Sequence, residues 1–388
     1  MYPRKISSNI ENSMINSEKN IIFLWGSRQT GKSTILNNLY SKFGGSYFNF
    51  DDLENKQVFV PELSKLISII KSKNNNPKSN FIFIDEVQNL PESTQAIKLL
   101  TDSSKYKVIA TGSSELRAKT HSFDSLAGRY IEFILYPLTI DEISIFKNDM
   151  SDFVNNPDFA ENEKLKNYVE ELMVYGSYPK VILTVDKISE LKNITQNSII
   201  KDIVNIYDLK NTDLVFNLLR LLANQIGNLI NVTEIANSLG STKITIDNYI
   251  EILKKNRVIY LLEPFKDNKR RGYLERKKVY FYDLGIRNSL IEDFRPTHLR
   301  QDLGAIFENL IVSGVLRQTE YSKNHNKLYF FREVAGSQKE IDLIVENTQG
   351  DKEGFEIKYT NGKINKIDDL GINSYKLINK ENSPIYLV

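Results

Sequence analysis

The chain has 388 residues, enough for two or three domains, and 41% of them are apolar, which is sufficient for more than one hydrophobic core. Its net charge of +2 is too small to indicate a nucleic-acid or membrane partner, so any such partner has to be argued from local patches. The absence of cysteine excludes disulfides and thiolate metal sites, and the three widely separated histidines argue against a zinc site.

The N-terminal segment, residues 1–14, lacks an apolar stretch of signal-peptide length. No apolar run in the chain approaches the ~18 residues needed to cross a bilayer. We therefore expect a soluble, cytoplasmic protein without a membrane partner.

The first predicted strand, residues 21–25, leads directly into a phosphate-binding loop of the pattern G-x-x-x-x-G-K-[ST]. Its glycines let backbone N–H groups turn toward phosphate oxygens, and the following helix adds the positive end of its dipole. Lys32 is expected to reach the β- and γ-phosphates, and the Ser33 hydroxyl to bind Mg²⁺. The predicted nucleotide-binding residues are Gly26, Ser27, Arg28, Gln29, Thr30, Gly31, Lys32, Ser33 and Thr34.

A second apolar run, residues 81–84, ends in two acidic residues, Asp85 and Glu86. We expect Asp85 to bind the nucleotide's Mg²⁺ through its water shell, and Glu86 to orient and deprotonate the attacking water. Either motif alone could be a chance glycine-rich turn or an acidic strand end. Together, each behind an apolar strand and in this order, they predict an ATP-hydrolysing site with ATP and Mg²⁺ as cofactors.

The surrounding pattern alternates strands and helices. Further buried strands are predicted at residues 47–50 and 108–110, and helices at 61–70 and 93–100, which indicates a doubly wound parallel α/β sheet with its ligand at the carboxyl ends of the strands. The last of these strands runs into Thr111-Gly112-Ser113-Ser114, where the hydroxyls would lie beside the γ-phosphate. Ser113 is the predicted sensor; a polar strand-to-loop turn is the alternative.

The phrases GSRQTGKST, IDEVQ, TGSS and SLAGRYIEFILYPLTIDE resemble the archaeal-type ATPases of the AAA+ superfamily. The L-A-G-R match implies that Arg129 is an arginine finger acting in a neighbouring subunit's site, and hence a homo-oligomer such as a hexameric ring. A structural arginine beside a strand is the alternative, and Arg117 is the second candidate finger. The chain departs from the pattern at the sensor, where Asn is usual, and at Ser177, where the lid's Gly-Tyr-Pro turn usually has Gly.

Residues 206–283 predict a winged helix-turn-helix. Four leucines lie on one helical face over 214–222, a second helix opens at 231–233 and stops at Gly240, and a third begins after Ser241 or Thr242. Strands predicted at 258–262 and 278–282 complete the three helices and hairpin of this motif.

The hairpin tip, residues 266–278, contains seven basic and two acidic residues, which predicts contacts with DNA phosphates. The third helix has few base-reading residues on its exposed side, so recognition of DNA structure is expected rather than of sequence. A solvated loop on a winged helix that binds protein is the alternative. The predicted DNA-binding residues are Lys269, Arg270, Arg271, Arg276, Lys277 and Lys278.

The resemblance continues through residues 280–287, 304–310 and 328–332. Here Glu308 lies on an amphipathic helix, Asp342 opens a strand, and Glu356-Ile357-Lys358 lies in a strand over 354–359 with its Glu and Lys on one face. This order resembles the PD-(D/E)XK nuclease core, without its proline.

The nuclease resemblance predicts Glu308, Asp342 and Glu356 as Mg²⁺ ligands. Lys358 would orient the water or stabilise the pentavalent phosphate. Solvated strand ends are one alternative, and a catalytically idle nuclease-like fold that binds DNA or forms oligomers is another.

The predicted domains are an AAA+ ATPase domain with a helical lid (1–205), a winged helix (206–283) and an α/β restriction-endonuclease-like domain (284–388). The leading hypothesis is an ATPase that remodels or translocates on DNA, such as branched DNA in repair or recombination or foreign DNA in defence, with a Mg²⁺-dependent nuclease site. The alternative is a nucleotide-gated regulatory ATPase whose winged helix and idle nuclease-like platform bind a protein partner.

Overall fold

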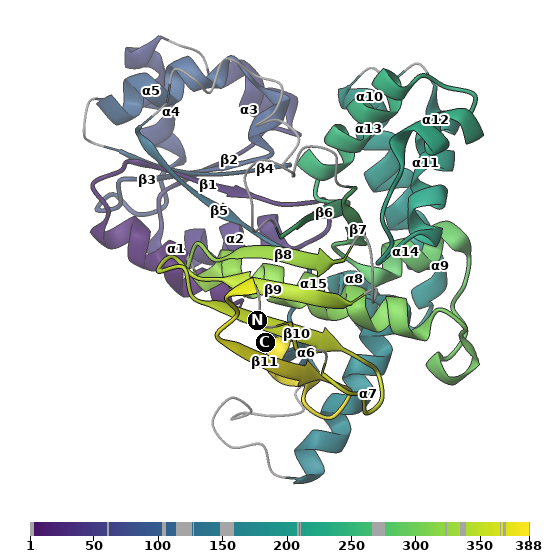
Figure 1. Cartoon of the computed structure of the whole chain (residues 1–388). Helices are drawn as coiled ribbons and strands as arrows, with labels where there is room; N and C mark the ends of the chain where they lie inside the picture. Colours follow the sequence, from purple (N-terminus) through teal and green to yellow (C-terminus); the bar gives the residue numbers. More distant parts are fainter. Residues whose placement is uncertain are drawn as a thin grey trace. The chain divides into compact units, whose positions relative to one another are not determined.

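The computed structural model describes residues 4–387 apart from 60–61, 103–105, 114–125, 127, 148–158, 208, 210, 266–275, 323, 334–338, 365 and 368–369 (Figure 1). By compactness the chain divides into two units, Met1–Tyr136 and Pro137–Val388. Residues 137–205, which belong to the predicted ATPase domain with its helical lid, thus fall in the second unit.

The first unit contains a five-stranded parallel sheet in the order β2-β3-β4-β1-β5. Four of its strands were predicted as buried strands, and β5 lies within the phrase SLAGRYIEFILYPLTIDE. The strands are β1 (Ile21–Trp25), β2 (Ser46–Asn49), β3 (Phe81–Asp85), β4 (Lys107–Gly112) and β5 (Tyr130–Ile134). The fully buried apolar sequence of β1 suits a central strand that is covered on both faces.

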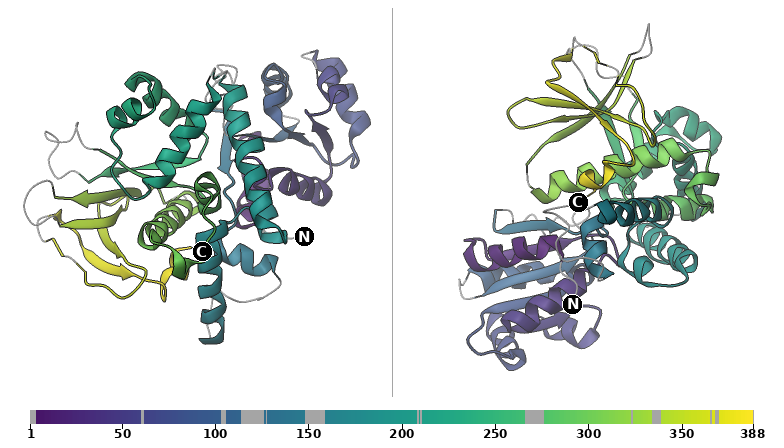
Figure 2. Two further views of the ribbon diagram at one scale, coloured as in Figure 1. Left: turned by 90° about the vertical axis from the view of Figure 1, so that its right-hand side faces the viewer. Right: turned by 90° about the horizontal axis from the view of Figure 1, so that it is seen from below.

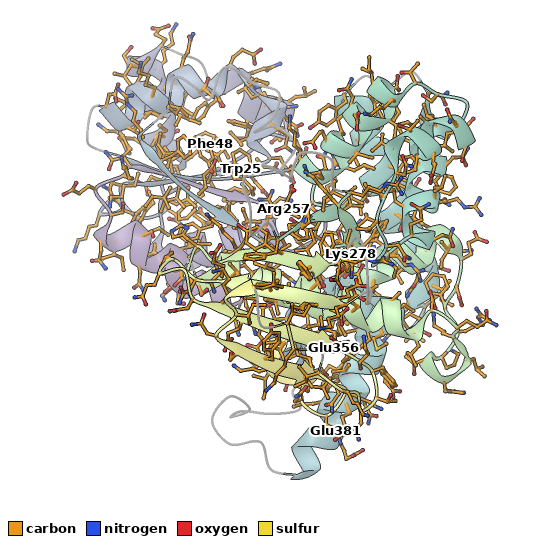
Figure 3. All side chains as sticks on the ribbon, viewed as in Figure 1. Trp25, Phe48, Arg257, Lys278, Glu356 and Glu381 are labelled. Atoms are coloured by element: carbon orange, nitrogen blue, oxygen red, sulfur yellow. The ribbon has the colours of Figure 1, made fainter. Side chains whose placement is uncertain are left out.

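Helices cover both faces of this sheet, with α1 and α2 on one side and α3, α4 and α5 on the other (Figure 1). The predicted helices at 61–70 and 93–100 correspond to α4 and α5. Trp25 and Phe48 belong to the core packed between the sheet and its helices (Figure 3). The helices are α1 (Lys5–Asn16), α2 (Lys32–Phe43), α3 (Leu53–Val58), α4 (Leu63–Lys73) and α5 (Ser93–Asp102), with a 3-10 turn at Val87–Asn89.

The second unit begins with a helical region. Its first helices are α6 (Ile140–Phe146), α7 (Phe159–Tyr175), α8 (Pro179–Leu183), α9 (Lys187–Asn193) and α10 (Lys201–Ile206), with a π-helical stretch at Ile194–Ile200. Among the described residues, none of the helices is both long and apolar enough to cross a membrane.

The three helices predicted for the winged helix are present as α11 (Thr212–Asn224), α12 (Val232–Ser238) and α13 (Lys243–Lys255). Their starts follow from local chemistry, because Asn231 and Thr242 accept hydrogen bonds from the first-turn amides of α12 and α13. The predicted hairpin strands are β6 (Ile259–Pro264) and β7 (Lys278–Phe281), which pair antiparallel.

The hairpin belongs to a mixed six-stranded sheet in the order β11-β10-β9-β8-β6-β7. β6 pairs in parallel with β8 through Glu263–Tyr329 and Pro264–Phe330, so the wing is continuous with the C-terminal sheet. Helix α15 (Leu303–Ser322) packs against this sheet, at β7 and β10 (Figure 2). The remaining strands are β8 (Lys327–Arg332), β9 (Glu340–Glu346), β10 (Lys352–Ile357) and β11 (Ser374–Ile378).

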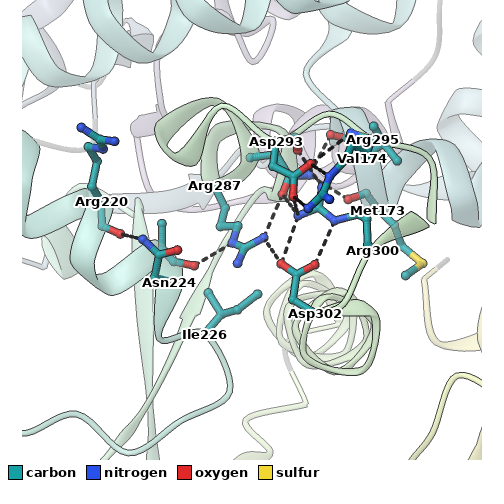
Figure 4. A network of polar contacts seen from close by, with 12 residues as sticks. Met173, Val174, Arg220, Asn224, Ile226, Arg287, Asp293, Arg295, Arg300 and Asp302 are labelled. Carbon is teal, nitrogen blue, oxygen red and sulfur yellow. Dashed lines mark hydrogen bonds and ion pairs between the residues drawn. The ribbon is translucent and has the colours of Figure 1, made fainter. Parts of the chain in front are cut away.

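Helix α14 (Leu284–Ile291) ties parts of the second unit together through a buried polar network (Figure 4). The Arg287 guanidinium donates to the carbonyl of Ala223 in α11 (2.7 Å) and to the Asp302 carboxylate (2.6 Å). The Asn288 amide donates to two carbonyls near the end of α7. The 3-10 turns Thr297–Leu299 and Ser383–Tyr386 complete the described secondary structure of this unit.

Candidate functional site

The phosphate-binding loop connects the end of β1 to the start of α2, as the motif predicts. Gly31 has a φ of 101°, a left-handed conformation that glycine adopts without strain, and it caps α2. A side chain at Gly26 would place its Cβ 2.5 Å from the carbonyl oxygen of Leu135. Both glycines are therefore required by the backbone path, and the first-turn amides of α2 are presented at the loop.

Lys32 lies inside the loop and is 4% exposed. Its Nζ donates to the carbonyls of Gly26 (2.9 Å) and Ser27 (3.0 Å). The other predicted loop residues differ in accessibility: Thr30 is buried, Ser33 is partly exposed, and Arg28 and Thr34 are exposed. The lysine ammonium and the partly exposed Ser33 hydroxyl are thus held next to the N-terminus of α2.

Sequence reasoning missed Arg4, which supports the loop from the start of α1. This buried guanidinium donates to the carbonyls of Thr30 (2.7 Å) and Tyr136 (2.7 Å). Arg4 is remote in sequence from both nucleotide motifs, and no local pattern marks an arginine near a chain end as a partner of a loop 26 residues away.

Asp85 lies at the carboxyl end of β3 and is 4% exposed. Its carboxylate accepts hydrogen bonds from the hydroxyls of Thr111, at the end of β4, and Tyr47, on β2 (3.1 Å to Tyr47). Burial, reinforced by the Asp85 carboxylate, raises the pKa of Tyr47, so the phenol stays a donor at neutral pH. Neighbouring strands therefore fix the predicted metal ligand in position.

Glu86 follows directly and has a φ of 55°, which is uncommon for a residue other than glycine. Its backbone N–H donates to the Thr111 hydroxyl (3.3 Å), and its carboxylate accepts a hydrogen bond from the Gln88 amide. The Gln88 side-chain oxygen in turn accepts from the N–H of Ser113 (3.2 Å). Gln88 therefore links the predicted base to the predicted sensor; its only sequence signal was its place in the IDEVQ phrase.

This donor set fits a nucleoside triphosphate with Mg²⁺. Amides at the start of α2 and the Lys32 ammonium suit phosphate oxygens, and the oxygens of Ser33 and Asp85 are the hard ligands that Mg²⁺ prefers. Of the other candidates near this site, Ser114 and Arg117 lie outside the described residues.

Arg129 is not near its own chain's phosphate-binding loop. It directly precedes β5, whose first residue lies beside Ile21 and whose last lies beside Trp25 in the parallel register. At ~3.3 Å per residue the start of β5 is roughly 15 Å from the loop end of the sheet. The Arg129 guanidinium is half exposed and pairs with Asp102 (3.0 Å). An action in a neighbouring subunit's site stays a prediction.

The predicted DNA-binding residues have different surroundings. Lys269, Arg270 and Arg271 lie outside the described residues, Arg276 is exposed, and Lys277 is partly exposed and pairs with Glu263 (2.5 Å). The prediction for Lys278 is wrong, because its side chain is 2% exposed and turned into the protein rather than toward solvent. Its Nζ pairs with Glu308 (2.9 Å) and Glu340 (2.6 Å).

The four residues of the nuclease-like pattern do come together, at β9, β10 and α15. The Asp342 carboxylate accepts from the N–H of Ile357 (2.8 Å) and pairs with Lys358 (3.4 Å). The same lysine pairs with Glu356 (2.9 Å). Glu308 accepts a hydrogen bond from the Tyr280 hydroxyl (2.6 Å) in addition to its ion pair with Lys278.

This arrangement does not fit a Mg²⁺ ion, contrary to the expectation for Glu308, Asp342 and Glu356. Within the described part of the chain, there is no group of three or more acidic, histidine or cysteine side chains placed to hold a metal. Each predicted ligand is already engaged by a lysine. Lys278 and Glu340 were missed as members of this cluster, although strand alternation at 278–282 puts Lys278 and Tyr280 on one face.

Comparisons with known proteins agree with the N-terminal part of this description. Residues 18–144 match the family model of an AAA domain. Residues 166–297 and 303–382 match two domains of unknown function, DUF8612 and DUF4143. The first part of the chain is therefore an AAA-type P-loop domain, and domains of this class generally bind ATP with Mg²⁺.

Among relatives, the uncharacterized protein MJ1544 of Methanocaldococcus jannaschii is 27% identical over 369 residues, which span 92% of this chain and 79% of that protein. An uncharacterized protein of Haemophilus influenzae is 26% identical over 337 residues, 82% of this chain and 78% of its own. A solved structure, the Walker-type ATPase paby2304 of Pyrococcus abyssi, aligns with a TM-score of 0.47 and 18% identity over 75% of this chain and 96% of that one. A likeness at this level supports no argument about function.

Proposed function

We propose that this chain is an ATP-hydrolysing AAA protein that acts on DNA and uses nucleotide turnover to remodel or move along it. The observation that carries the ATPase part is the convergence of Lys32, Asp85 and Glu86 at the carboxyl edge of one parallel sheet, with the phosphate-binding loop beside them.

The residues of the site have separate roles in ATP binding and hydrolysis. The loop amides and Lys32 bind the β- and γ-phosphates, and Glu86 orients the attacking water and accepts its proton. Gln88 holds the Glu86 carboxylate, and Thr111 holds that of Asp85. Ser33 and Asp85 would hold Mg²⁺, which when bound neutralises charge on the phosphates.

A homo-oligomer, such as a hexameric ring, is part of the proposal. Arg129 lies at the end of the sheet opposite its own phosphate-binding loop and is half exposed, which supports a role at a neighbouring copy's nucleotide rather than at its own. A finger supplied in this way neutralises charge that develops on the phosphates.

The DNA part rests on the winged-helix elements α11–α13, β6 and β7 and on the basic hairpin tip between the two strands. Even without Lys278 the tip keeps a clear excess of positive charge. If about four of these charges meet phosphates, affinity falls roughly a hundredfold between about 50 and 200 mM salt.

The test is the ATPase rate measured with forked, duplex and single-stranded DNA and without DNA, beside DNA binding over a salt titration. We expect at least one DNA structure to stimulate turnover and to bind in a salt-dependent manner. Lys32→Ala is the control: it should lose turnover and keep DNA binding. The DNA part is refuted if no DNA stimulates turnover and none binds in a salt-sensitive way.

A second candidate is a regulatory ATPase whose nucleotide state sets whether the winged helix and an idle C-terminal platform bind a protein partner. The observation that favours it is the ionic cluster around Lys278, which engages the acidic residues a cutting site would need. DNA cleavage is for that reason not part of the proposed function. Nucleotide-dependent assembly without any response to DNA would favour this second candidate.

A further inference from the structure

Lys278 is buried among acidic side chains, whereas its neighbour in sequence is not. The Lys278 side chain is 2% exposed and that of Lys277 is 37% exposed, although both belong to the same basic segment. The Lys278 ammonium joins β7 to Glu308 on α15 and to Glu340 on β9, and lies 5.5 Å from the centre of the Phe330 ring on β8. One cation thus contacts the three elements packed around it.

The negative charge around it is offset in part by basic side chains of the protein. Four carboxylates are present, those of Glu308, Glu340, Asp342 and Glu356, and two lysines engage them. The two ammonium groups supply the charge of one divalent cation, at nitrogen–oxygen distances of 2.6–3.4 Å. Octahedral Mg²⁺ would instead need several oxygens at about 2.0–2.1 Å.

Burial raises the pKa of Glu308 and of Glu356, which lessens the negative charge that the two lysines leave uncompensated. Burial lowers the pKa of Lys278, but the carboxylates of Glu308, Glu340 and Asp342 outweigh that effect and raise it, so the ammonium persists at neutral pH. Burial also raises the pKa of Tyr280, and the Glu308 carboxylate adds to that, so the phenol remains a hydrogen-bond donor.

We propose that the Lys278 ammonium, together with that of Lys358, takes the place of a divalent cation in this acidic cluster, and that Lys278 serves as a metal-independent clamp. The clamp fastens strand β7, which begins at the last residue of the basic hairpin tip, to helix α15 and strand β9. The C-terminal sheet then supports the β6–β7 hairpin rigidly and is not a nuclease active site. This inference does not depend on ATP hydrolysis.

The experiment measures thermal unfolding and bound Mn²⁺, by electron paramagnetic resonance, in nucleotide-free protein with EDTA or with millimolar Mn²⁺. The variants are Lys278→Met, its matched neighbour Lys277→Met, and Asp342→Asn. Because the ATP site can bind Mn²⁺ in all of them, the informative quantity is the difference between wild type and Asp342→Asn.

We expect wild type and Asp342→Asn to bind the same amount of Mn²⁺. Adding Mn²⁺ should also change the Tm of both proteins by the same amount. Lys278→Met should lower the Tm by about 5–10 °C in EDTA, since it leaves buried carboxylates without their cation. Mn²⁺ should restore part of that loss, while Lys277→Met should resemble wild type.

Mn²⁺ bound to the wild type and lost in Asp342→Asn would overturn the proposal. So would Mn²⁺-dependent DNA cleavage by the wild type that Asp342→Asn abolishes. Because both results come without any change at Lys278, they decide the matter even if Lys278→Met does not fold.

Discussion

At the scale of single residues, Glu86 has the most informative geometry. A left-handed backbone costs a non-glycine residue on the order of 1 kcal/mol and persists only where the surroundings impose it. Here the surroundings are Thr111, which accepts from its N–H, and Gln88, which donates to its carboxylate. A residue held at its backbone by Thr111 and at its carboxylate by Gln88 suits a group that has to orient a water molecule.

Replacing Glu86 with Gln should separate binding from hydrolysis. The amide has nearly the same size but cannot accept a proton, so we expect ATP binding to be retained and turnover to fall by roughly 10²-fold or more. Turnover and binding of a fluorescent ATP analogue are the two measurements, and Lys32→Ala, which should lose both, is the control. Normal turnover in Glu86→Gln would show that the base has been assigned wrongly.

At the scale of elements, the turn after α7 shows how one backbone conformation joins two helices. Gly176 has a φ of 66°, and the buried Asp283 carboxylate accepts from the N–H of Ser177 (2.7 Å) and of Ile286 (3.2 Å) in α14. Burial raises the pKa of Asp283, and these N–H groups oppose the rise. The Ser177 hydroxyl adds contacts that the glycine usual at this position could not make, because it donates to Asp283 (3.4 Å) and accepts from Arg317 (3.3 Å).

Gly176→Ala should destabilise the second unit strongly. A Cβ at this position would overlap the Asp283 carboxylate, and the left-handed φ adds to the strain, so we expect a loss of about 2–4 kcal/mol. The matched control is Gly240→Ala, which has a similar φ of 59° but open space around it and should cost only about 1 kcal/mol. Thermal unfolding followed by far-UV circular dichroism compares them; equal losses would refute the role given to Asp283.

At the scale of the whole molecule, acid sensitivity should arise in the second unit. Hydrogen bonds from Arg295 lower the pKa of Asp293 to about 2. Burial raises the pKa of Asp302, but hydrogen bonds from Arg300 and Arg287 outweigh it and leave the pKa low. Because the folded values lie below the unfolded value of about 3.9, these carboxylates stabilise the fold above pH 4 and lose that effect as the pH falls toward 2.

Asp302→Asn should therefore flatten the dependence of stability on pH between about 4 and 2. It should also lower stability at neutral pH, since the buried Arg287 loses its carboxylate. Tm measured across this pH range gives both effects, with Asp213→Asn, exposed on α11, as the control for removing one carboxyl group. An unchanged slope in Asp302→Asn would contradict this origin of the acid sensitivity.

The sequence by itself determined the local parts of this protein. The strand and loop around Lys32, the acidic strand end at Asp85, and the helix starts at Asn231 and Thr242 all follow from patterns within a few neighbouring residues, because apolar periodicity, glycine conformation and capping act over that range.

The tertiary structure decided the contacts between strands and helices that lie far apart in the sequence. The register that pairs β6 with β8 and the packing of α15 against β7 turned Lys278 from an apparent DNA contact into a buried partner of Glu308 and Glu340. Sequence spacing carries no signal for such a pairing, because a one-residue shift in register would have put the same lysine in solvent.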